Sequence, residues 1–277
     1  MTKGSPLPKI LKAIVLIALV LFCFFPFYFT ILNSFRQIRQ IPDMGWLPTR
    51  LSLANWVKAF APGSLAPRWV FNSLFVCIII SILTLFFDSI AGYAFARGKF
   101  PGNQLFFLTI IFCITVPFAV LLIPIYTMMA KAHLLNTYIA LIAPAASPVG
   151  VFMMRQAISS IPKDFDEAAK LDGCSEFGIF WRVIMPLAAP ALASVFIITF
   201  VAQWNWFSYP FIVTTKQTML TLTVALYTEA LTAASSLWPP QWGFILVLIA
   251  LSFGPMFAMF LLFQEYFTKG VVMSGIK

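Results

Sequence analysis

Charged residues are scarce in this sequence. Asp, Glu, Lys and Arg together make up 10% of the 277 residues, whereas 61% are hydrophobic and the mean hydropathy is +0.94. An ordinary soluble domain is roughly a quarter charged. The apolar residues also stand in blocks that are longer than the core helices of a soluble protein. These features exclude a water-soluble fold and predict an integral membrane protein.

Metal-binding clusters and phosphate-binding loops are also missing. The sequence has one histidine, His133, and its four cysteines include no C-x-x-C pair, so no disulfide framework or zinc site is predicted. The single G-K dipeptide, Gly98-Lys99, precedes Phe100 and has no glycine five residues before it, so the chain is not expected to hydrolyse ATP. With no nucleophile arrangement either, we predict that the chain is not an enzyme and binds no metal or cofactor of its own.

The excess of basic residues has an explanation other than nucleic acid. Eighteen Lys and Arg against nine Asp and Glu give a formal charge of +9, but the basic residues are scattered between apolar blocks. Basic residues that flank membrane spans set their orientation and contact lipid headgroups. Placing the N-terminus in the cytoplasm puts 11 of them inside and 7 outside. We therefore expect a lipid-embedded chain with a cytoplasmic N-terminus and no nucleic-acid partner.

Six apolar stretches are long enough to cross a bilayer, because about 20 helical residues span its core of roughly 30 Å. They lie at about 11–33, 70–96, 105–130, 137–155, 187–213 and 242–264. Several contain proline, so kinked helices in a bundle are expected. The fold class is therefore all-α and polytopic, with a transmembrane domain over 11–264 and cytoplasmic tails at 1–10 and 265–277. The first apolar run exceeds the length of a secretory signal and is read as a retained span.

The cytoplasmic segment 156–186 gathers most of the acids. Five of the nine Asp and Glu residues lie between Asp164 and Glu176, which suggests a solvated docking surface. Acids near 164 suit the first turn of a helix, Gly173 suits a left-handed cap, and Ser175 can cap a second helix. The segment is predicted to form two short helices joined at a glycine bend. An amphipathic hairpin lying on lipid is the alternative from composition alone.

The same segment resembles the signature loop of the permeases of ATP-binding-cassette importers, EAA-x3-G-x9-I-x-L-P. The matching residues are Glu167, Ala168, Ala169, Gly173 and Pro186. Val183 and Met185 stand in for the Ile and Leu of the pattern. The loop also lies between the fourth and fifth of the six predicted spans. The chain is thus identified as similar to a type I importer permease that carries the EAA loop.

Further stretches are similar to the carbohydrate branch of that family, and most of all to the maltose-type subunit without a large external domain. They are NSL at 72–74, GYAFARGKFPG at 92–102, LIPIYTMMAKAHLLNTYIALI at 122–142, MRQAISSIPKDFDEAAKLDG at 154–173, WN at 204–205 and the ending QEYFTKGVVMSGIK. The resemblance runs through nearly the whole chain. It implies a multi-pass protein of the bacterial inner membrane that helps to import a sugar or oligosaccharide.

The resemblance also implies partners and site residues. The partners are a second permease, two nucleotide-binding subunits that hydrolyse ATP with Mg²⁺, and an external solute-binding protein. The coupling residues implied for the hairpin, which would sit in a cleft of the ATPase, are Glu167, Ala168, Ala169, Asp172, Gly173 and Pro186. The C-terminal tail would reach the ATPase through Gly270, Gly275 and Lys277.

Candidates for a substrate path come from side-chain chemistry. Amides and aromatic faces suit the hydroxyls and apolar faces of sugar rings, and an acid within a span must face protein or water. The candidates are Asp88, Gln203, Trp204, Asn205 and Tyr209. Interhelical hydrogen bonding and an interfacial aromatic belt remain alternatives for them. A non-sugar solute such as a phosphorylated polyol, or an ion-coupled carrier that uses Asp88, remains the alternative function.

Overall fold

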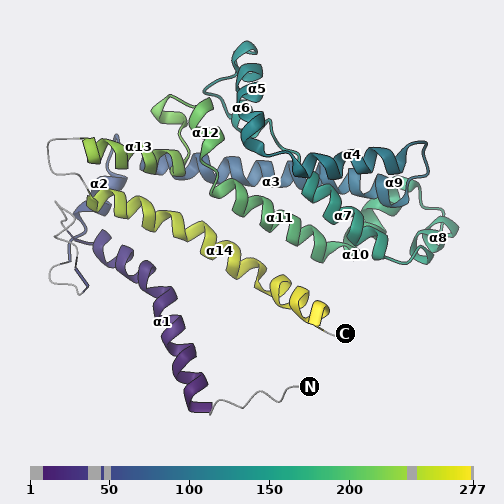
Figure 1. The fold of residues 1–277 in the computed structure, drawn as a ribbon, viewed down its shortest axis with the longest axis horizontal. Coiled ribbons are helices and arrows are strands. Elements are labelled where there is room, and N and C mark those ends of the chain that lie inside the picture. Colours follow the sequence, from purple (N-terminus) through teal and green to yellow (C-terminus); the bar gives the residue numbers. More distant parts are fainter. Residues whose placement is uncertain (1–8, 37–44, 47–50, 236–241, 276–277) are drawn as a thin grey trace. The chain divides into compact units, whose positions relative to one another are not determined.

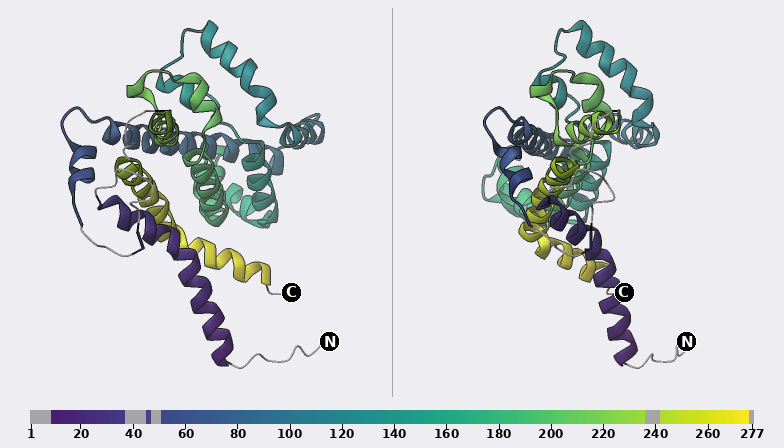
Figure 2. Two further views of the ribbon diagram at one scale, coloured as in Figure 1. Left: turned by 60° about the vertical axis from the view of Figure 1, so that its left-hand side comes forward. Right: turned by 90° about the vertical axis from the view of Figure 1, so that its left-hand side faces the viewer.

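A computed structural model describes residues 9–36, 45–46, 51–235 and 242–275 of the chain (Figure 1). Over these residues the structure is all helical and contains no strand, as predicted. The chain divides into two compact units, each made from segments that are distant in sequence: Met1–Pro67 with Leu226–Gly254, and Arg68–Ala225 with Pro255–Lys277. Figure 2 shows the same helices from two further sides.

The first unit contains the N-terminal helix α1 (Lys9–Ser34), α2 (Ala54–Phe60), and parts of α13 (Leu222–Ser235) and α14 (Trp242–Gly275). Helix α1 covers the predicted span 11–33, and its apolar side chains are exposed, Phe22 to 78%. At its C-terminal end, Asn33 is fully buried and its amide donates to the Phe29 and Gly45 carbonyls. An apolar outer surface with its polar groups bonded internally is what a lipid-facing helix requires.

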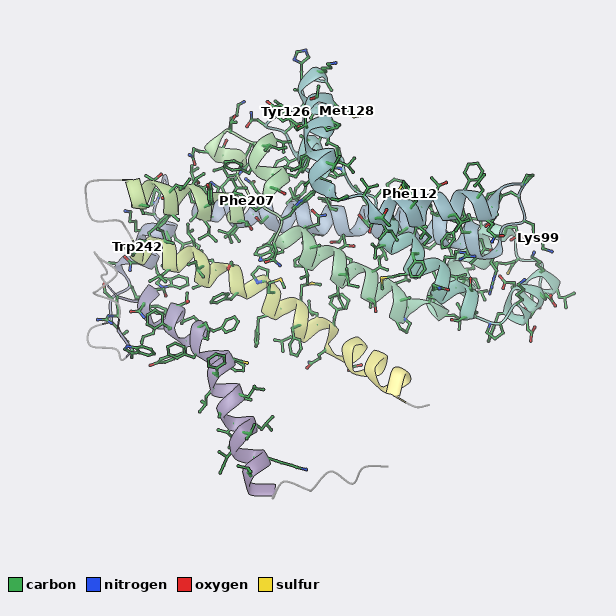
Figure 3. All side chains as sticks on the ribbon, viewed as in Figure 1. Lys99, Phe112, Tyr126, Met128, Phe207 and Trp242 are labelled. Carbon is green, nitrogen blue, oxygen red and sulfur yellow. The ribbon has the colours of Figure 1, made fainter. Side chains whose placement is uncertain are left out.

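The second unit contains most of α3, the helices from α4 to η3, the start of α13 and the last part of α14. Their bounds are α3 (Ala66–Arg97), α4 (Asn103–Thr115), α5 (Phe118–Lys131), α6 (Tyr138–Ile142), α7 (Pro148–Ser160), α8 (Asp164–Leu171), α9 (Glu176–Ile179), the π-helical η2 (Phe180–Ile184), α10 (Met185–Leu187), α11 (Ala189–Trp204), α12 (Ser208–Val213) and the 3₁₀ helix η3 (Gln217–Met219). Apolar side chains on α4 and α5 are exposed, among them Phe112 and Met128 in Figure 3.

Three of the predicted spans are single helices that are long and apolar enough to cross a membrane: Leu11–Ser34, Ala66–Arg97 and Trp242–Glu265. The predicted span 105–130 is instead a pair of helices, α4 and α5, that meet at an angle of 99°. The break falls at Val116 and Pro117, which have extended backbones. Proline has no N–H to donate and pushes the preceding residue out of the helical region, so the helix ends there.

The other two predicted spans are also interrupted. Within 137–155 the structure has the short α6 and then α7, separated by 143–147. Pro144 lies in this gap, Pro148 opens α7, and Ser147 caps α7 by accepting a hydrogen bond from the Gly150 N–H. Within 187–213, α11 ends at Trp204 and α12 begins at Ser208. The continuous helices predicted for these stretches are therefore replaced by shorter ones, of which α6 and α7 have side-chain caps at Thr137 and Ser147.

The NSL segment near the start of α3 holds the backbone of residues 218–222 by hydrogen bonds, and we call this set of bonds the clamp. The buried Asn72 amide donates to the carbonyls of Thr218 and Leu220, at 3.0 and 2.9 Å, and its oxygen accepts from the Tyr138 hydroxyl at 2.7 Å. The neighbouring Ser73 hydroxyl accepts from the Leu222 N–H at 2.7 Å. Side chains from one turn of α3 thus form hydrogen bonds with backbone groups of a segment that lies 146 to 149 residues later in the sequence.

Replacing Asn72 with alanine should destabilise the protein by about 2 kcal/mol, because two carbonyls and one hydroxyl lose their buried partner. The thermal midpoint of the purified protein in detergent measures this loss. Asn205→Ala is the matched control, since the exposed Asn205 amide donates to the Val201 carbonyl of the preceding helix and, among the described residues, to no distant segment. Equal midpoints for the two variants would contradict the clamp.

Candidate functional site

The acidic segment forms the predicted pair of helices with a glycine bend. Helix α8 runs from Asp164 to Leu171, and Gly173 has a φ of +80°, in the left-handed region. The Gly173 N–H donates to the Lys170 carbonyl and the Cys174 N–H to the Ala169 carbonyl, which is the Schellman arrangement of a helix C-terminus. Ser175 then caps α9 by accepting from the Gly178 N–H. We call residues 164–187 the coupling hairpin.

The second arm of the coupling hairpin is less regular than expected. Helix α9 ends at Ile179 and continues into the π-helical η2 and then α10. A π turn is a rare, wider turn that is frequent at functional sites. It ends at Ile184, two residues before Pro186, whose missing N–H removes one ordinary helical bond. Pro186 itself is exposed.

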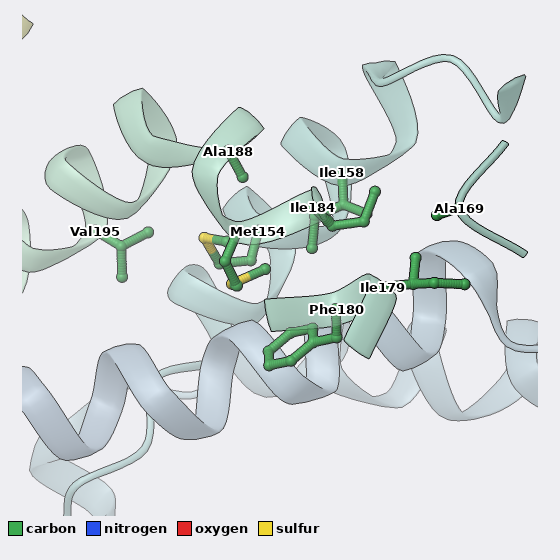
Figure 4. Packing of buried hydrophobic residues seen from close by; sticks show 9 residues of the cluster. Met154, Ile158, Ala169, Ile179, Phe180, Ile184, Ala188 and Val195 are labelled. Carbon is green, nitrogen blue, oxygen red and sulfur yellow. The ribbon is translucent and has the colours of Figure 1, made fainter. Parts of the chain in front are cut away.

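One face of the coupling hairpin is buried against α7. Ile179 and Ile184 are fully buried in a cluster with Met154 and Ile158 of α7, shown in Figure 4. Ala169 belongs to the same cluster and is 7% exposed. The family resemblance implies that both alanines of the motif contact a partner. The structure exposes only Ala168, whereas Ala169 is small because it packs against the chain's own helices.

The end of α3 fixes the coupling hairpin through a buried ion pair. The Arg97 Nε lies 2.9 Å from Asp166 Oδ2, and the two side chains are only 9% and 13% exposed. The Arg97 Nη2 also donates to the Ile161 carbonyl at 2.8 Å, at the end of α7. Asp166 is thus an internal anchor, whereas the sequence predicted a solvated acid. The other four acids of the hairpin are exposed as expected: Asp164, Glu167, Asp172 and Glu176.

Sequence reasoning missed Arg97 as a functional residue. It was counted only as a basic residue that flanks a span, although it lies inside the GYAFARGKFPG stretch that supports the family resemblance. That stretch was the available signal. The pairing with Asp166 could not be read from it, because 68 intervening residues place no constraint on which acid Arg97 meets.

A second ion pair holds the two arms of the hairpin together. The Lys170 Nζ lies 2.6 Å from Glu176 Oε1, and the Tyr93 hydroxyl donates to Glu176 Oε2 at 3.4 Å. The hydrogen bond from Lys170 lowers the pKa of Glu176, and the same bond raises the pKa of Lys170. Both side chains are more than half exposed, so solvent screens this pair. It shapes the surface and adds little to stability.

The surface where the hairpin meets the end of α3 is open to solvent and carries both charged and apolar side chains. A cleft of about 550 Å³ lies between the hairpin and the end of α3. It is lined by Tyr93, Ala94, Arg97, Gly98, Lys99, Lys163, Asp166, Glu167, Lys170 and Glu176. Lys99 is labelled in Figure 3. Leu171 and Phe177 are 89% and 71% exposed beside these charges. Exposed apolar groups rimmed by charges are typical of a protein-binding surface.

The predicted tail contacts lie at the end of α14. This helix continues through Gly270 to Gly275, so the segment predicted as a tail from 265 is helical in the structure. Lys277 lies outside the described residues. The contacts of these three residues with an ATPase stay a prediction.

Four of the substrate-path candidates lie where α11 ends and α12 begins, and the fifth, Asp88, lies on α3. Trp204 and Tyr209 are buried, and the Tyr209 hydroxyl donates to the Ala140 carbonyl at 2.6 Å. Gln203 is half-buried and Asn205 exposed. Asp88 is 1% exposed and lies against α7. Gln203 and Asn205 are thus the candidates whose amide groups solvent can reach. Contact with a sugar stays a prediction for all five candidates.

Comparisons with known proteins place these features in a family context. Residues 87–272 match the family described as binding-protein-dependent transport system inner membrane component. The chain is 34% identical over 280 residues to the arabinooligosaccharides transport system permease protein AraQ of Halalkalibacterium halodurans, with 99% of each chain covered. It is 30% identical to the lactose transport system permease protein LacG of Rhizobium radiobacter, over 97% of this chain and 96% of that one.

A solved structure is similar in fold. It is a chain of a bacterial ABC transporter involved in the import of the acidic polysaccharide alginate, with a TM-score of 0.80. The match covers 95% of this chain and 100% of that one at 20% sequence identity. At that identity the likeness concerns the fold, which is that of an importer permease.

Proposed function

Because this chain belongs to the family of binding-protein-dependent transport system inner membrane components, we propose that it forms one half of the translocation path of an ATP-driven sugar or oligosaccharide importer. Relatives that cover nearly its full length are permeases named for arabinooligosaccharides and lactose, which supports a carbohydrate as the solute. The second half of the path is a related permease. A solute-binding protein delivers the sugar from outside.

The observation that carries the proposal is the two-sided construction of the coupling hairpin. Its inner face is fastened to α3 and α7 by Asp166, Ala169 and Ile179, and its outer face presents Glu167, Ala168 and Leu171. A partner that pushes on the outer face therefore moves two helices of the bundle at once. We place ATP and Mg²⁺ on two nucleotide-binding partner subunits, and we assign no catalytic step to this chain.

Uptake by the assembled transporter tests the proposal. The chain is coexpressed with the second permease, the ATPase subunits and the binding protein from neighbouring reading frames, and labelled arabinooligosaccharides or lactose are offered to proteoliposomes with ATP inside. We expect uptake that needs ATP and the binding protein, and none from this chain alone. An ATPase subunit with its phosphate-loop lysine replaced is the control.

Two outcomes would contradict the proposal. Accumulation by this chain alone, abolished by collapsing the membrane potential, would identify an ion-coupled carrier. ATP-dependent uptake of a phosphorylated polyol with no sugar uptake would agree with an ATP-driven importer but would show that its solute is not a sugar. Each outcome is visible in the same vesicles, because the solute and the energy source are varied separately.

A further inference from the structure

Helices α3 and α7 pack closely along a shared face that contains a glycine from each helix. A Cβ built on Gly92 of α3 would lie 2.6 Å from the Met154 Cβ of α7. A Cβ built on Gly150 of α7 would overlap the Asp88 carboxylate of α3. Small residues at a helix interface let two backbones approach closely within a membrane. Neither helix can therefore move far without the other.

Asp88 occupies the space that the missing side chain of Gly150 leaves. It is 1% exposed, and its Oδ1 accepts a hydrogen bond from the Ser147 N–H at 3.4 Å, although the two residues are 59 apart in sequence. Ser147 is the residue that caps α7. A carboxylate at this position meets the positive end of the α7 dipole. In the described part of the chain, its Oδ2 has no hydrogen-bond partner.

The other end of α7 is tied to α3 as well. The Arg97 Nη2 donates to the carbonyl of Ile161, the C-cap of α7, and Arg97 also pairs with Asp166 of the coupling hairpin. Contacts therefore run in the same order along both helices: Asp88 with Gly150, Gly92 with Met154, and Arg97 with Ile161. Helix α7 thus runs parallel to the C-terminal part of α3 and is fastened to it at both of its own ends.

We propose that Asp88 is a positioning residue that locks the start of α7 to α3, so that the two helices move as one rigid lever when the coupling hairpin is displaced. The proposal rests on the proposed function of the hairpin. Asp88 does not touch the solute in this scheme; it acts through Gly150 and Ser147. It also gives a physical reason for an acid within an apolar helix, where an ionised carboxylate is otherwise costly to insert into a membrane.

The test is a double-mutant cycle in the assembled transporter, with G150A, D88A and D88A/G150A. G150A drives its new methyl group into the carboxylate and should lower the amount of solute imported per ATP hydrolysed about fivefold. D88A should do the same, because the start of α7 is released. In the double variant the alanine fits the vacated space, so its loss should be no larger than that of either single variant. Gly254→Ala is the control, since a Cβ there meets nothing within 4 Å.

Each alternative gives a different pattern. If the contact matters only for folding, the variants lower the thermal midpoint and the yield of complex but leave solute per ATP unchanged. If Asp88 binds solute, D88A raises the KM for uptake and G150A does not. The reductions in solute imported per ATP in the two single variants then multiply in the double variant. Either pattern overturns the proposal. If the wild-type complex imports no sugar, the proposed function is wrong. The Asp88–Gly150 contact is tested separately: if the thermal midpoint of the double variant falls by the sum of the two single-variant losses, the two residues do not interact.

Discussion

Reversing the charge of Arg97 by an R97E substitution is expected to destabilise the protein by about 3 to 5 kcal/mol, the usual cost of breaking a buried ion pair from one side. The new Glu carboxylate would lie against the Asp166 carboxylate at a buried position, since the wild-type Arg97 and Asp166 side chains are only 9% and 13% exposed. The Ile161 carbonyl would lose its donor as well. The thermal midpoint and the yield of assembled transporter are the measurements.

The exposed pair of the same hairpin provides the matched control. Lys170 and Glu176 are 54% and 69% exposed, and K170E reverses a charge there without burying it. We expect K170E to melt close to wild type, because an exposed ion pair contributes little. The second variant, R97D/D166R, restores opposite charges and should recover part of the loss. If R97E melts like K170E, Arg97 does not anchor the hairpin.

Charge reversal at Glu167 should uncouple transport while leaving the chain folded. Glu167 is exposed and lines the cleft next to α3. Among the described residues, E167K breaks no hydrogen bond or ion pair and removes only the attraction between the Glu167 carboxylate and Lys170. Under the proposed function the Glu167 carboxylate faces a basic group of the ATPase, and a lysine in its place would repel that group. We expect both uptake and binding-protein-stimulated ATPase activity to fall by up to about 100-fold, the upper range of site-to-site coupling.

Gly173→Val is the companion variant, because it changes the bend and not the charge. Gly173 has a φ of +80° and open space around it, so the cost is backbone strain of roughly 1 to 2 kcal/mol, with no clash. The second arm of the hairpin should then leave its position and lower both activities. Asp164→Lys is the control, since Asp164 is an exposed acid of the same helix outside the cleft lining. Wild-type activities in E167K and G173V would refute the coupling role.

Local chemistry made part of the site predictable. The glycine bend at Gly173 and the cap at Ser175 were predicted, because each depends on a few consecutive residues and on a backbone preference that travels with the residue type. The exposure of Glu167 and Ala168 agrees with the same local reasoning. The long apolar helices α1, α3 and α14 were predicted from length and hydropathy, which the thickness of a bilayer fixes.

Contacts between residues that are distant in sequence could not be predicted from local chemistry. Prolines predicted kinks, but whether a proline bends a helix or ends it depends on which neighbours satisfy the freed carbonyls. The 99° break between α4 and α5 and the gap between α6 and α7 were therefore not located. Ala169 was assigned to the contact with the ATPase and Asp166 was expected to be solvated, since composition cannot say which way a short helix faces.

Composition and the length of the apolar stretches were enough to predict a helical membrane protein, and local spacing was enough to predict an acidic helical hairpin within 156–186, which the EAA motif assigned to the importer-permease family. What the hairpin is attached to became visible only in the packed structure. Arg97 and Ile161 are 64 residues apart, and Asp88 and Ser147 are 59 apart. Such contacts form because helix packing brings their backbones within reach, and no short-range pattern encodes which partners meet.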